Sequence, residues 1–164
     1  LHSFPTPFLQ GPVVNYSIGG ETAESLAKRV AHYKSLSRAK QVILLTGLND
    51  LMQGRSPKEI AISIARVLDH IPATTSVALV GILPLRRADT MDRSILETNH
   101  LLANLSSGRA HCMFINTQSL ADASGSLRSN FATADGIHLT SAGYAQLAIL
   151  LNSALRQPFP LQHP

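Results

Sequence analysis

The stretch Ser76-Val77-Ala78-Leu79-Val80-Gly81-Ile82-Leu83 is an almost continuous apolar run without the clean alternation of a half-buried strand. Three other short runs have the same character: Val13 to Tyr16, Gln41 to Thr46 and Cys112 to Asn116. Runs of this kind are typical of strands that are buried on both faces, as in a parallel sheet covered by helices. The sequence therefore predicts four β-strands.

Helical patterns separate these runs. Thr22 can cap a helix that runs to about Leu36, and Ser56-Pro57-Lys58-Glu59 is a capping box with proline at the first helical position. A further helix is predicted over Thr90 to Leu105, and the last one from about Ser141 to Leu155. Apolar residues share one face of the second helix (Ile60, Ile64, Val67, Leu68, Ile71) and of the last (Tyr144, Leu147, Ala148, Leu151, Leu155).

The regular alternation of strands and helices predicts the fold class. Short connections and right-handed crossovers imply an α/β fold, a three-layer sandwich with helices on both faces of a parallel sheet. We expect a single domain over residues 1–157 and a proline-rich tail over residues 158–164 that cannot continue a helix. Functional loops of such sheets gather at the carboxyl ends of the strands, where Ser17 to Glu21, Gly47 to Asp50 and Pro84 to Asp89 fall.

Composition narrows the function classes. The net charge is +4, but the basic residues are scattered and only 5% of residues are aromatic, so no nucleic-acid partner is expected. The seven histidines are dispersed and Cys112 is the single cysteine, so no disulfide within the chain, no metal site and no cofactor is expected. The run Val77 to Leu85 is too short to span a membrane, and no signal peptide is visible, which leaves both a cytoplasmic and an exported protein open.

An acidic residue lies three positions before a histidine at the entrance to the last helix, in Asp135-Gly136-Ile137-His138. This spacing lets the carboxylate of Asp135 hold one imidazole nitrogen of His138 while the other nitrogen faces outward as a general base. Serine hydrolases use such an arrangement. Taken alone, the segment also fits a capping loop with an incidental histidine.

Two strand-end segments could supply hydrogen-bond donors. In Asn15 to Thr22, the glycines Gly19-Gly20 let backbone N–H groups approach a ligand, and the following helix N-terminus favours negative charge. In Gly47-Leu48-Asn49-Asp50, the Asn49 amide can donate to a developing oxyanion, while Asp50 braces the loop by accepting backbone N–H groups. Taken singly, the first also fits a plain strand-to-helix turn and the second an Asx-type turn.

In this order, the three segments resemble the SGNH hydrolases, also called the GDSL esterase/lipase family. Val14 to Thr22 resembles the second block of the family, with Gly20 at the position of its oxyanion-hole glycine. Asn49 stands where the Gly-x-Asn-Asp block has its side-chain oxyanion donor. Asp135 and His138 match the Asp-x-x-His block, where they would be the orienting carboxylate and the general base.

The resemblance extends beyond these three blocks. The continuation Leu139-Thr140-Ser141-Ala142-Gly143-Tyr144 is similar to the family, and so is Gly81-Ile82-Leu83-Pro84 followed by a helix that contains Asn99. Together the similar segments cover Pro12 to Leu155. They imply the flavodoxin-like SGNH hydrolase fold.

The chain departs from the family at its first block, Gly-Asp-Ser, which supplies the nucleophile and is absent. The favoured hypothesis is that Leu1 is the leucine of Gly-Asp-Ser-Leu, so that the first strand and the catalytic serine lie upstream. In a second hypothesis, Ser17 or Ser3 is the nucleophile. In a third, the domain is non-catalytic and only binds a ligand, such as a phosphate-bearing molecule at Gly19-Gly20.

On the favoured hypothesis, the resemblance implies an ester hydrolase that works through an acyl-enzyme. Short acyl or acetyl esters of small molecules or carbohydrates are the expected substrates. The sequence leaves the acyl and alcohol specificity and the oligomeric state open.

Overall fold

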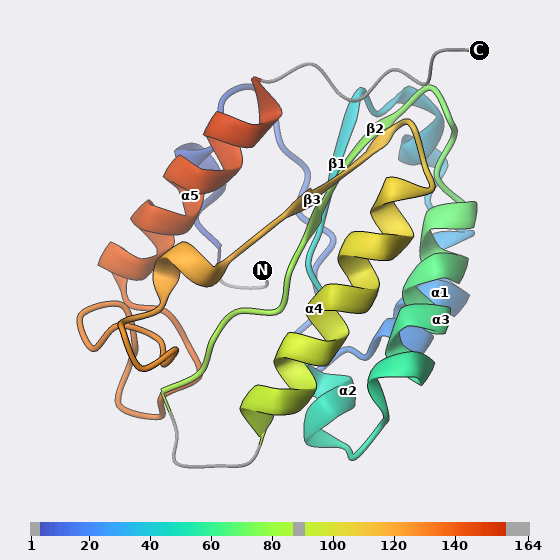
Figure 1. The fold of residues 1–164 in the computed structure, drawn as a ribbon. Helices are drawn as coiled ribbons and strands as arrows, with labels where there is room; N and C mark the ends of the chain where they lie inside the picture. Colours follow the sequence, from blue (N-terminus) through green and yellow to red (C-terminus); the bar gives the residue numbers. More distant parts are fainter. Residues whose placement is uncertain (1–3, 87–90, 157–164) are drawn as a thin grey trace.

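Three parallel strands form the sheet of the computed structural model, which describes residues 4–86 and 91–156. The strands are β1 (Gln41–Leu44), β2 (Ser76–Val80) and β3 (Cys112–Ile115), hydrogen-bonded in the order β1-β2-β3. In this register Val77 lies between Val42 on one side and Cys112 on the other. The sheet runs through the middle of the molecule (Figure 1).

The central strand β2 is buried on both faces. Val77 and Leu79 point into one hydrophobic cluster, whereas Ala78 and Val80 point into a second one on the opposite face. These four side chains are at most 1% exposed. Burying a valine or leucine side chain contributes about 1.5–3 kcal/mol, so this one strand stabilises both layers of helices.

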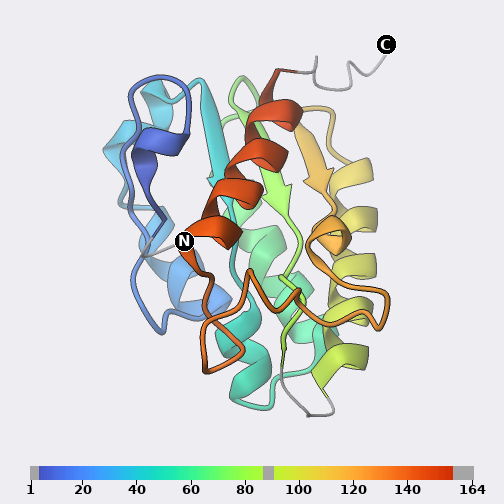
Figure 2. The same ribbon diagram turned by 90° about the vertical axis from the view of Figure 1, so that its left-hand side faces the viewer.

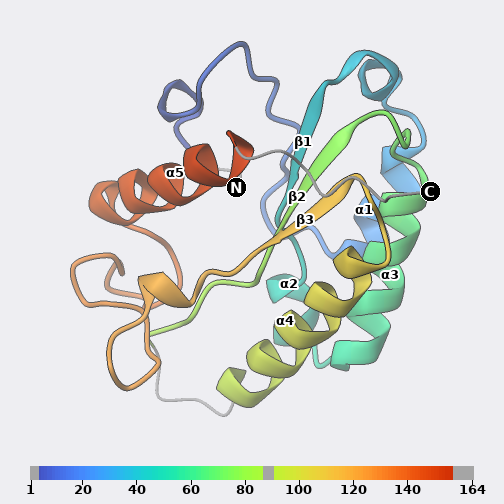
Figure 3. The same ribbon diagram turned by 45° about the horizontal axis from the view of Figure 1, so that its top comes forward.

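Helices cover both faces of the sheet, as the alternation of elements predicts. On the first face α1, α3 and α4 pack side by side, and on the second α5 packs against β2 and β3 (Figures 1 and 3). The helices and 3-10 turns are η1 (Thr6–Phe8), α1 (Ala23–Val30), η2 (Lys34–Arg38), α2 (Leu48–Met52), α3 (Pro57–Asp69), α4 (Met91–Ser107), η3 (Gln118–Leu120) and α5 (Ser141–Leu155). The α/β sandwich with a parallel sheet is confirmed.

Capping signals in the sequence begin three of the helices. Ser56 and Glu59 form the predicted capping box of α3, with the Glu59 carboxylate accepting from Ser56 N–H at 2.8 Å. Thr22 caps α1 by accepting from Ser25 N–H, and Thr140 caps α5 by accepting from Gly143 N–H, each at 3.2 Å. These local hydrogen bonds satisfy backbone donors that the first helical turn leaves unpaired.

The first helix is shorter than the prediction of a helix running to about Leu36. It ends at Val30. His32 N–H and Tyr33 N–H then donate to carbonyls three residues earlier, as in a 3-10 turn, instead of continuing the four-residue spacing of the α-helix. The Tyr33 ring then stacks on Tyr16, with 4.4 Å between ring centroids. This contact with a distant loop is not encoded in the local helical pattern.

The predicted strand at Val13 to Tyr16 is wrong for the described chain. The segment has no strand assignment, and Val14 is 70% exposed. An extended segment becomes a strand only when a neighbour accepts and donates its ladder hydrogen bonds, and no described strand pairs with this one. The apolar side chains of this segment, which suggested a buried strand, therefore lie on the surface.

The three observed strands end earlier than predicted, by one to three residues. After β2 the reason is that the Asn99 side chain of α4 forms hydrogen bonds with the backbone N–H and carbonyl of Ile82. The Asn99 side chain accepts from Ile82 N–H at 2.7 Å and donates to Ile82 O at 2.9 Å. A side-chain amide thus replaces the neighbouring strand.

Some predicted features lie outside the described residues. They are Leu1, Ser3, residues 87–89 of the segment Pro84 to Asp89, the helix start at Thr90, and the tail at 158–164. Within the described ranges, no helix combines the length and the apolar character needed to cross a bilayer.

Gly143→Ala should destabilise the protein, because α5 packs too closely for a methyl group there. A Cβ at Gly143 would lie 2.6 Å from Phe131 O and 3.1 Å from the Leu139 side chain. Overpacking typically costs about 1–3 kcal/mol, and the better helix propensity of alanine offsets about 1 kcal/mol of this. The matched control is Gly108→Ala, where the nearest atom is Leu105 O at 3.9 Å. Equal free energies of unfolding for the two variants in urea titration would contradict this packing.

Cys112 should be unreactive in the folded protein. Its thiol is buried in β3, and burial raises its pKa to about 11, so the reactive thiolate is scarce at pH 8. We expect labelling by a disulfide reagent at pH 8 to be at least about 100-fold slower in buffer than in guanidinium chloride. Rapid labelling of the native protein would contradict the burial of this thiol in β3.

Candidate active site

The segments singled out in the sequence gather at the carboxyl ends of the strands. In Figure 2 the strand arrows point toward the edge where α2 and the loop before α5 lie. Two hydrogen bonds join the segments there: Asn49 Nδ2 donates to Glu21 O at 2.9 Å, and Arg86 N–H donates to Gly136 O at 2.8 Å. This edge is where ligands bind in open parallel sheets.

Asp135 and His138 form the carboxylate–imidazole pair that their spacing predicts. Asp135 Oδ2 lies 2.6 Å from His138 Nδ1. The other oxygen, Oδ1, accepts from Ile137 N–H at 2.8 Å, His138 N–H at 3.0 Å and the Thr133 hydroxyl at 2.7 Å. The His138 side chain is 68% exposed, so its far nitrogen is accessible to a ligand.

The charge on Asp135 decides which nitrogen of the imidazole carries the proton. The hydrogen bond from His138, followed by those from the backbone of His138 and Ile137 and from Thr133, holds the pKa of Asp135 well below its usual range. An ionised carboxylate only accepts hydrogen bonds, so Nδ1 of His138 must donate. Nε2 is thereby left as the basic nitrogen of the neutral ring.

A tight backbone loop creates this geometry. Gly136 adopts a φ of +69°, a left-handed conformation that lets the chain turn between the two side chains. Gly136 N–H donates to Thr133 O, and Thr133 N–H donates to His138 O, each at 2.9 Å. Ile137 packs against the hydrophobic cluster under α3 and α4, which anchors the loop to the core.

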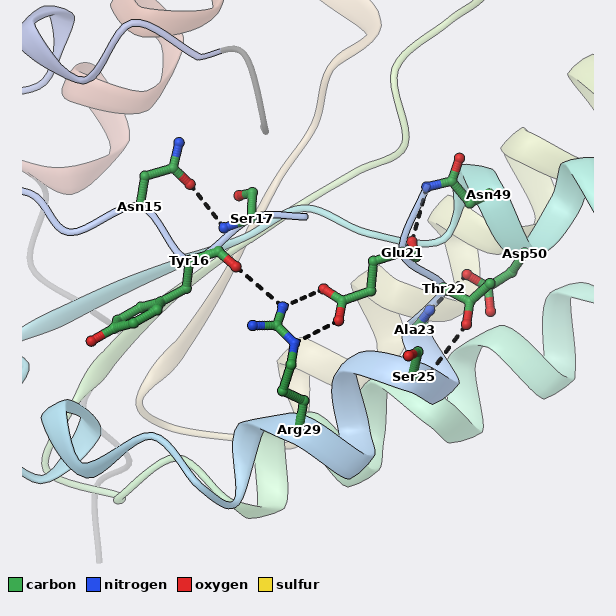
Figure 4. A network of polar contacts seen from close by, with 10 residues as sticks. All are labelled: Asn15, Tyr16, Ser17, Glu21, Thr22, Ala23, Ser25, Arg29, Asn49 and Asp50. Carbon is green, nitrogen blue, oxygen red and sulfur yellow. Dashed lines mark hydrogen bonds and ion pairs between the residues drawn. The ribbon is translucent and has the colours of Figure 1, made fainter. Parts of the chain in front are cut away.

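The Asn49 side chain is tied to the turn at Gly20, because it donates a hydrogen bond to the carbonyl of the next residue, Glu21. Gly20 has a φ of +76° and open space where a Cβ would point. The bond to Glu21 O uses one of the two hydrogens of the Asn49 amide (Figure 4). Within the described part of the chain, no group accepts its second hydrogen or that of Gly20 N–H. Two donors thus remain for a ligand at this turn.

A clamp that sequence reasoning missed holds this turn in place. Arg29 of α1 donates from Nε to the Glu21 carboxylate at 2.7 Å and from Nη2 to Tyr16 O at 3.1 Å (Figure 4). Its guanidinium also lies 5.0 Å from the centre of the Tyr33 ring. Charge-assisted bonds of this kind are stronger than neutral ones, and they fix the loop on the helix. The spacing of Glu21 and Arg29 carries no helical signal, because Glu21 lies outside the helix.

Asp50 braces the start of α1, rather than its own loop as the sequence predicted. Its Oδ2 accepts from Ala23 N–H at 2.8 Å, next to the Thr22 cap of α1. Its Oδ1 is buried and has no hydrogen-bond partner in the described chain. Burial raises the pKa of Asp50. Asn49 and Asp50 therefore hydrogen-bond the backbone of the two residues that flank Thr22.

The candidate internal nucleophile Ser17 lies in the loop held by Arg29 (Figure 4). Ser17 N–H donates to Asn15 Oδ1 at 2.9 Å. Among the residues described, the only hydrogen-bond partner of the His138 ring is Asp135, so no described hydroxyl is bonded to its Nε2. In the same ranges, no three His, Cys, Asp or Glu side chains are grouped to hold a metal ion.

Comparison with known families gives a match over most of the chain. Residues 6–146 match the GDSL-like Lipase/Acylhydrolase family. No curated protein sequence matches the chain significantly.

Solved structures with less than 25% identity share the fold. A Streptococcus pneumoniae protein, provisionally described as a platelet activating factor, superposes with a TM-score of 0.84 at 24% identity, covering 93% of this chain and 78% of its own. A Desulfitobacterium hafniense DCB-2 protein, provisionally described as a lipolytic protein of the G-D-S-L family, gives 0.76 at 17% identity, covering 90% and 83%. A carbohydrate esterase family 3 protein from Talaromyces cellulolyticus gives 0.69 at 19% identity, covering 83% and 67%.

Asp50→Asn should change how stability depends on pH. Because burial raises the pKa of Asp50, ionising it costs stability above its unfolded pKa of about 3.9, and this cost disappears as the pH falls. Asparagine keeps an acceptor for Ala23 N–H without the charge. We therefore expect the free energy of unfolding of the variant, relative to the wild type, to be more favourable at pH 7 than at pH 4.

Asp122→Asn is the matched control for this measurement. Hydrogen bonds from the Ser124 side chain and backbone lower the pKa of Asp122, so its ionised form stabilises the fold and this contribution is lost in acid. The control should trend in the opposite direction, and the same trend in both variants would contradict the role of Asp50 burial.

Proposed function

This chain belongs to the GDSL-like lipase/acylhydrolase family and is thus an ester hydrolase, and we propose that it cleaves short acyl or acetyl esters through an acyl-enzyme. The observation that carries the proposal is the Asp135–His138 pair, with 2.6 Å between Oδ2 and Nδ1, at the carboxyl edge of the sheet. An oriented imidazole with one accessible nitrogen is what activation of a hydroxyl nucleophile requires.

In the proposed reaction a serine hydroxyl attacks the acyl carbon of the ester. His138 Nε2 takes the hydroxyl proton as the serine oxygen bonds to carbon, and Asp135 stabilises the imidazolium that forms. The tetrahedral intermediate collapses, the bond to the alcohol breaks, and His138 gives its proton to the leaving oxygen. Water then attacks the acyl-enzyme with the same base, which releases the acid and restores the serine.

The oxyanion of the tetrahedral intermediate would be held by Gly20 N–H and the Asn49 amide. Support for these roles comes from one donor on each residue that has no acceptor among the described residues. The Arg29–Glu21 clamp and the Asp50 bond to Ala23 would keep both donors in place before the substrate arrives. Preorganised donors of this kind stabilise charge without reorganising during the reaction.

We place the nucleophilic serine immediately before Leu1. Phe4, the first described residue, is buried and packs edge-on against Tyr144 of α5, with 5.9 Å between ring centroids. Tyr144 lies in the first turn of the helix that follows His138. A residue four positions before Phe4 can reach at most about 14 Å from it, which is compatible with contact at this loop.

The substrate is proposed to carry a short acyl group, such as acetate, on a small molecule or a carbohydrate. Of the apolar side chains of α2, Leu51 is buried in the core, Leu48 is partly buried, and only Met52 is largely exposed, at 47%. This helix therefore presents little apolar surface to a long acyl chain. Short chains therefore fit the loop better than long ones.

Hydrolysis of p-nitrophenyl acetate by this chain, and by the protein extended upstream with its natural residues, tests the proposal. We expect activity only in the extended protein, and loss of that activity in His138→Ala. Activity of both proteins that Ser17→Ala abolishes would replace the upstream serine with Ser17. Absence of hydrolysis from both, on acetyl to octanoyl esters, would favour a domain that only binds ligands.

In the extended enzyme, Asn49→Ala should lower kcat by about 10²–10³-fold, the usual effect of losing one oxyanion donor. Part of the change is structural because Asn49 also bonds Glu21 O, so the free energy of unfolding must be measured alongside. The matched control is Asn104→Ala on the exposed surface of α4, where His100 is the only hydrogen-bond partner of the side-chain amide in the described part of the chain. If Asn49→Ala folds and keeps the kcat of the control, Asn49 is not an oxyanion donor.

A further inference from the structure

Thr133 contacts both members of the Asp135–His138 pair. Its hydroxyl lies 2.7 Å from Asp135 Oδ1 and 3.0 Å from His138 O. Its N–H donates to His138 O and its carbonyl accepts from Gly136 N–H, each at 2.9 Å. The residue therefore touches the beginning, the middle and the end of the loop, and its backbone alone is enough to close the loop.

The hydroxyl has a separate task from the backbone, because the carboxylate of Asp135 divides its two oxygens between different partners. Oδ1 accepts from Thr133 Oγ1, Ile137 N–H and His138 N–H, whereas among the described residues Oδ2 bonds only to the His138 imidazole. Three donors on one oxygen set the rotation of the carboxylate about its Cβ–Cγ bond. Thr133 supplies the only side-chain donor of the three.

We propose that Thr133 is a positioning residue whose hydroxyl holds Asp135 Oδ1, so that Oδ2 stays aligned with Nδ1 of His138. Its catalytic consequence rests on the proposed ester hydrolase function, but its effect on the imidazole does not. The pair is about half exposed, with 48% of the Asp135 side chain accessible, so water competes for the carboxylate whenever a fixed donor is lost. If the carboxylate rotated toward water, Nδ1–H would lose its acceptor, and the imidazole tautomer that carries its hydrogen on Nδ1 would no longer be favoured.

The electrostatics of the loop agree with this role. The His138 side chain contributes most to the lowered pKa of Asp135, the two backbone donors come next, and the Thr133 hydroxyl also contributes. Each of these groups favours the ionised carboxylate that Nδ1–H needs as an acceptor.

Two substitutions separate the hydroxyl from the shape of the side chain. Thr133→Val keeps the β-branched shape and the backbone bonds but removes the hydroxyl, whereas Thr133→Ser keeps the hydroxyl and removes the methyl group. If Thr133 only shapes the loop, valine should be the milder change. If the hydroxyl positions Asp135, serine should be the milder change.

The ring ¹⁵N chemical shifts of His138 provide a readout that needs no nucleophile. They report the ratio of the Nδ1–H to the Nε2–H form in the ¹⁵N-labelled chain of 164 residues, at a pH where the imidazole is neutral. His138→Ala identifies the signals. We expect Thr133→Ser to keep the wild-type ratio and Thr133→Val to lower it at least twofold. A wild-type ratio in Thr133→Val, or an equal loss in both variants, would overturn the proposal.

Kinetics of the upstream-extended enzyme give the second arm. Thr133→Val should lower kcat on p-nitrophenyl acetate by about three- to tenfold with KM unchanged, whereas Thr133→Ser should keep the wild-type kcat. If the ring responds as expected but no variant hydrolyses esters, the positioning role stands and the proposed function fails. If the wild type hydrolyses esters and Thr133→Val matches it in kcat and in ring state, the positioning role fails alone.

Discussion

Burial of β2 on both faces is the constraint from which the rest of the structure follows. Its alternate side chains enter two separate hydrophobic clusters, Val77 and Leu79 on one side and Ala78 and Val80 on the other. Neither cluster is complete without its own helices, so α3 and α4 must cover one face and α5 the other. Since the strands are parallel, their carboxyl ends then meet at one edge, and the loops that leave them become neighbours.

Side chains that bond to backbone join the loops at this edge of the sheet, in addition to the packing of Ile137 against the core. Asn99 occupies the N–H and carbonyl of Ile82, where β2 ends. Asn49 takes the Glu21 carbonyl and Asp50 takes Ala23 N–H. Bonds of this kind suit a site that must stay open to substrate, because they fix loops without filling the space between them with apolar groups.

The accuracy of the sequence-based predictions follows the range of the interactions behind them. The capping box of α3 and the Asp135–His138 pair each lie within four residues, so spacing alone was sufficient to find them. The strand predicted at Val13 to Tyr16 is wrong in the described chain, because a strand depends on a partner that local composition does not reveal. The helix predicted to Leu36 fails for a similar reason, since Tyr33 is used in a contact with a distant loop.

The sequence by itself determined three of the strands, the helices α1, α3, α4 and α5, the family and the acid–histidine pair, because each follows from local periodicity or a short motif. The short helix α2 was expected as a turn and was not predicted. Only the tertiary structure decided that the turn at Gly20 meets the Asn49 amide, and that Arg86 fastens the loop at Gly136. These contacts join segments from 28 to 50 residues apart. Their geometry exists only after β2 has buried both of its faces and aligned the strand ends, which no short stretch of sequence specifies.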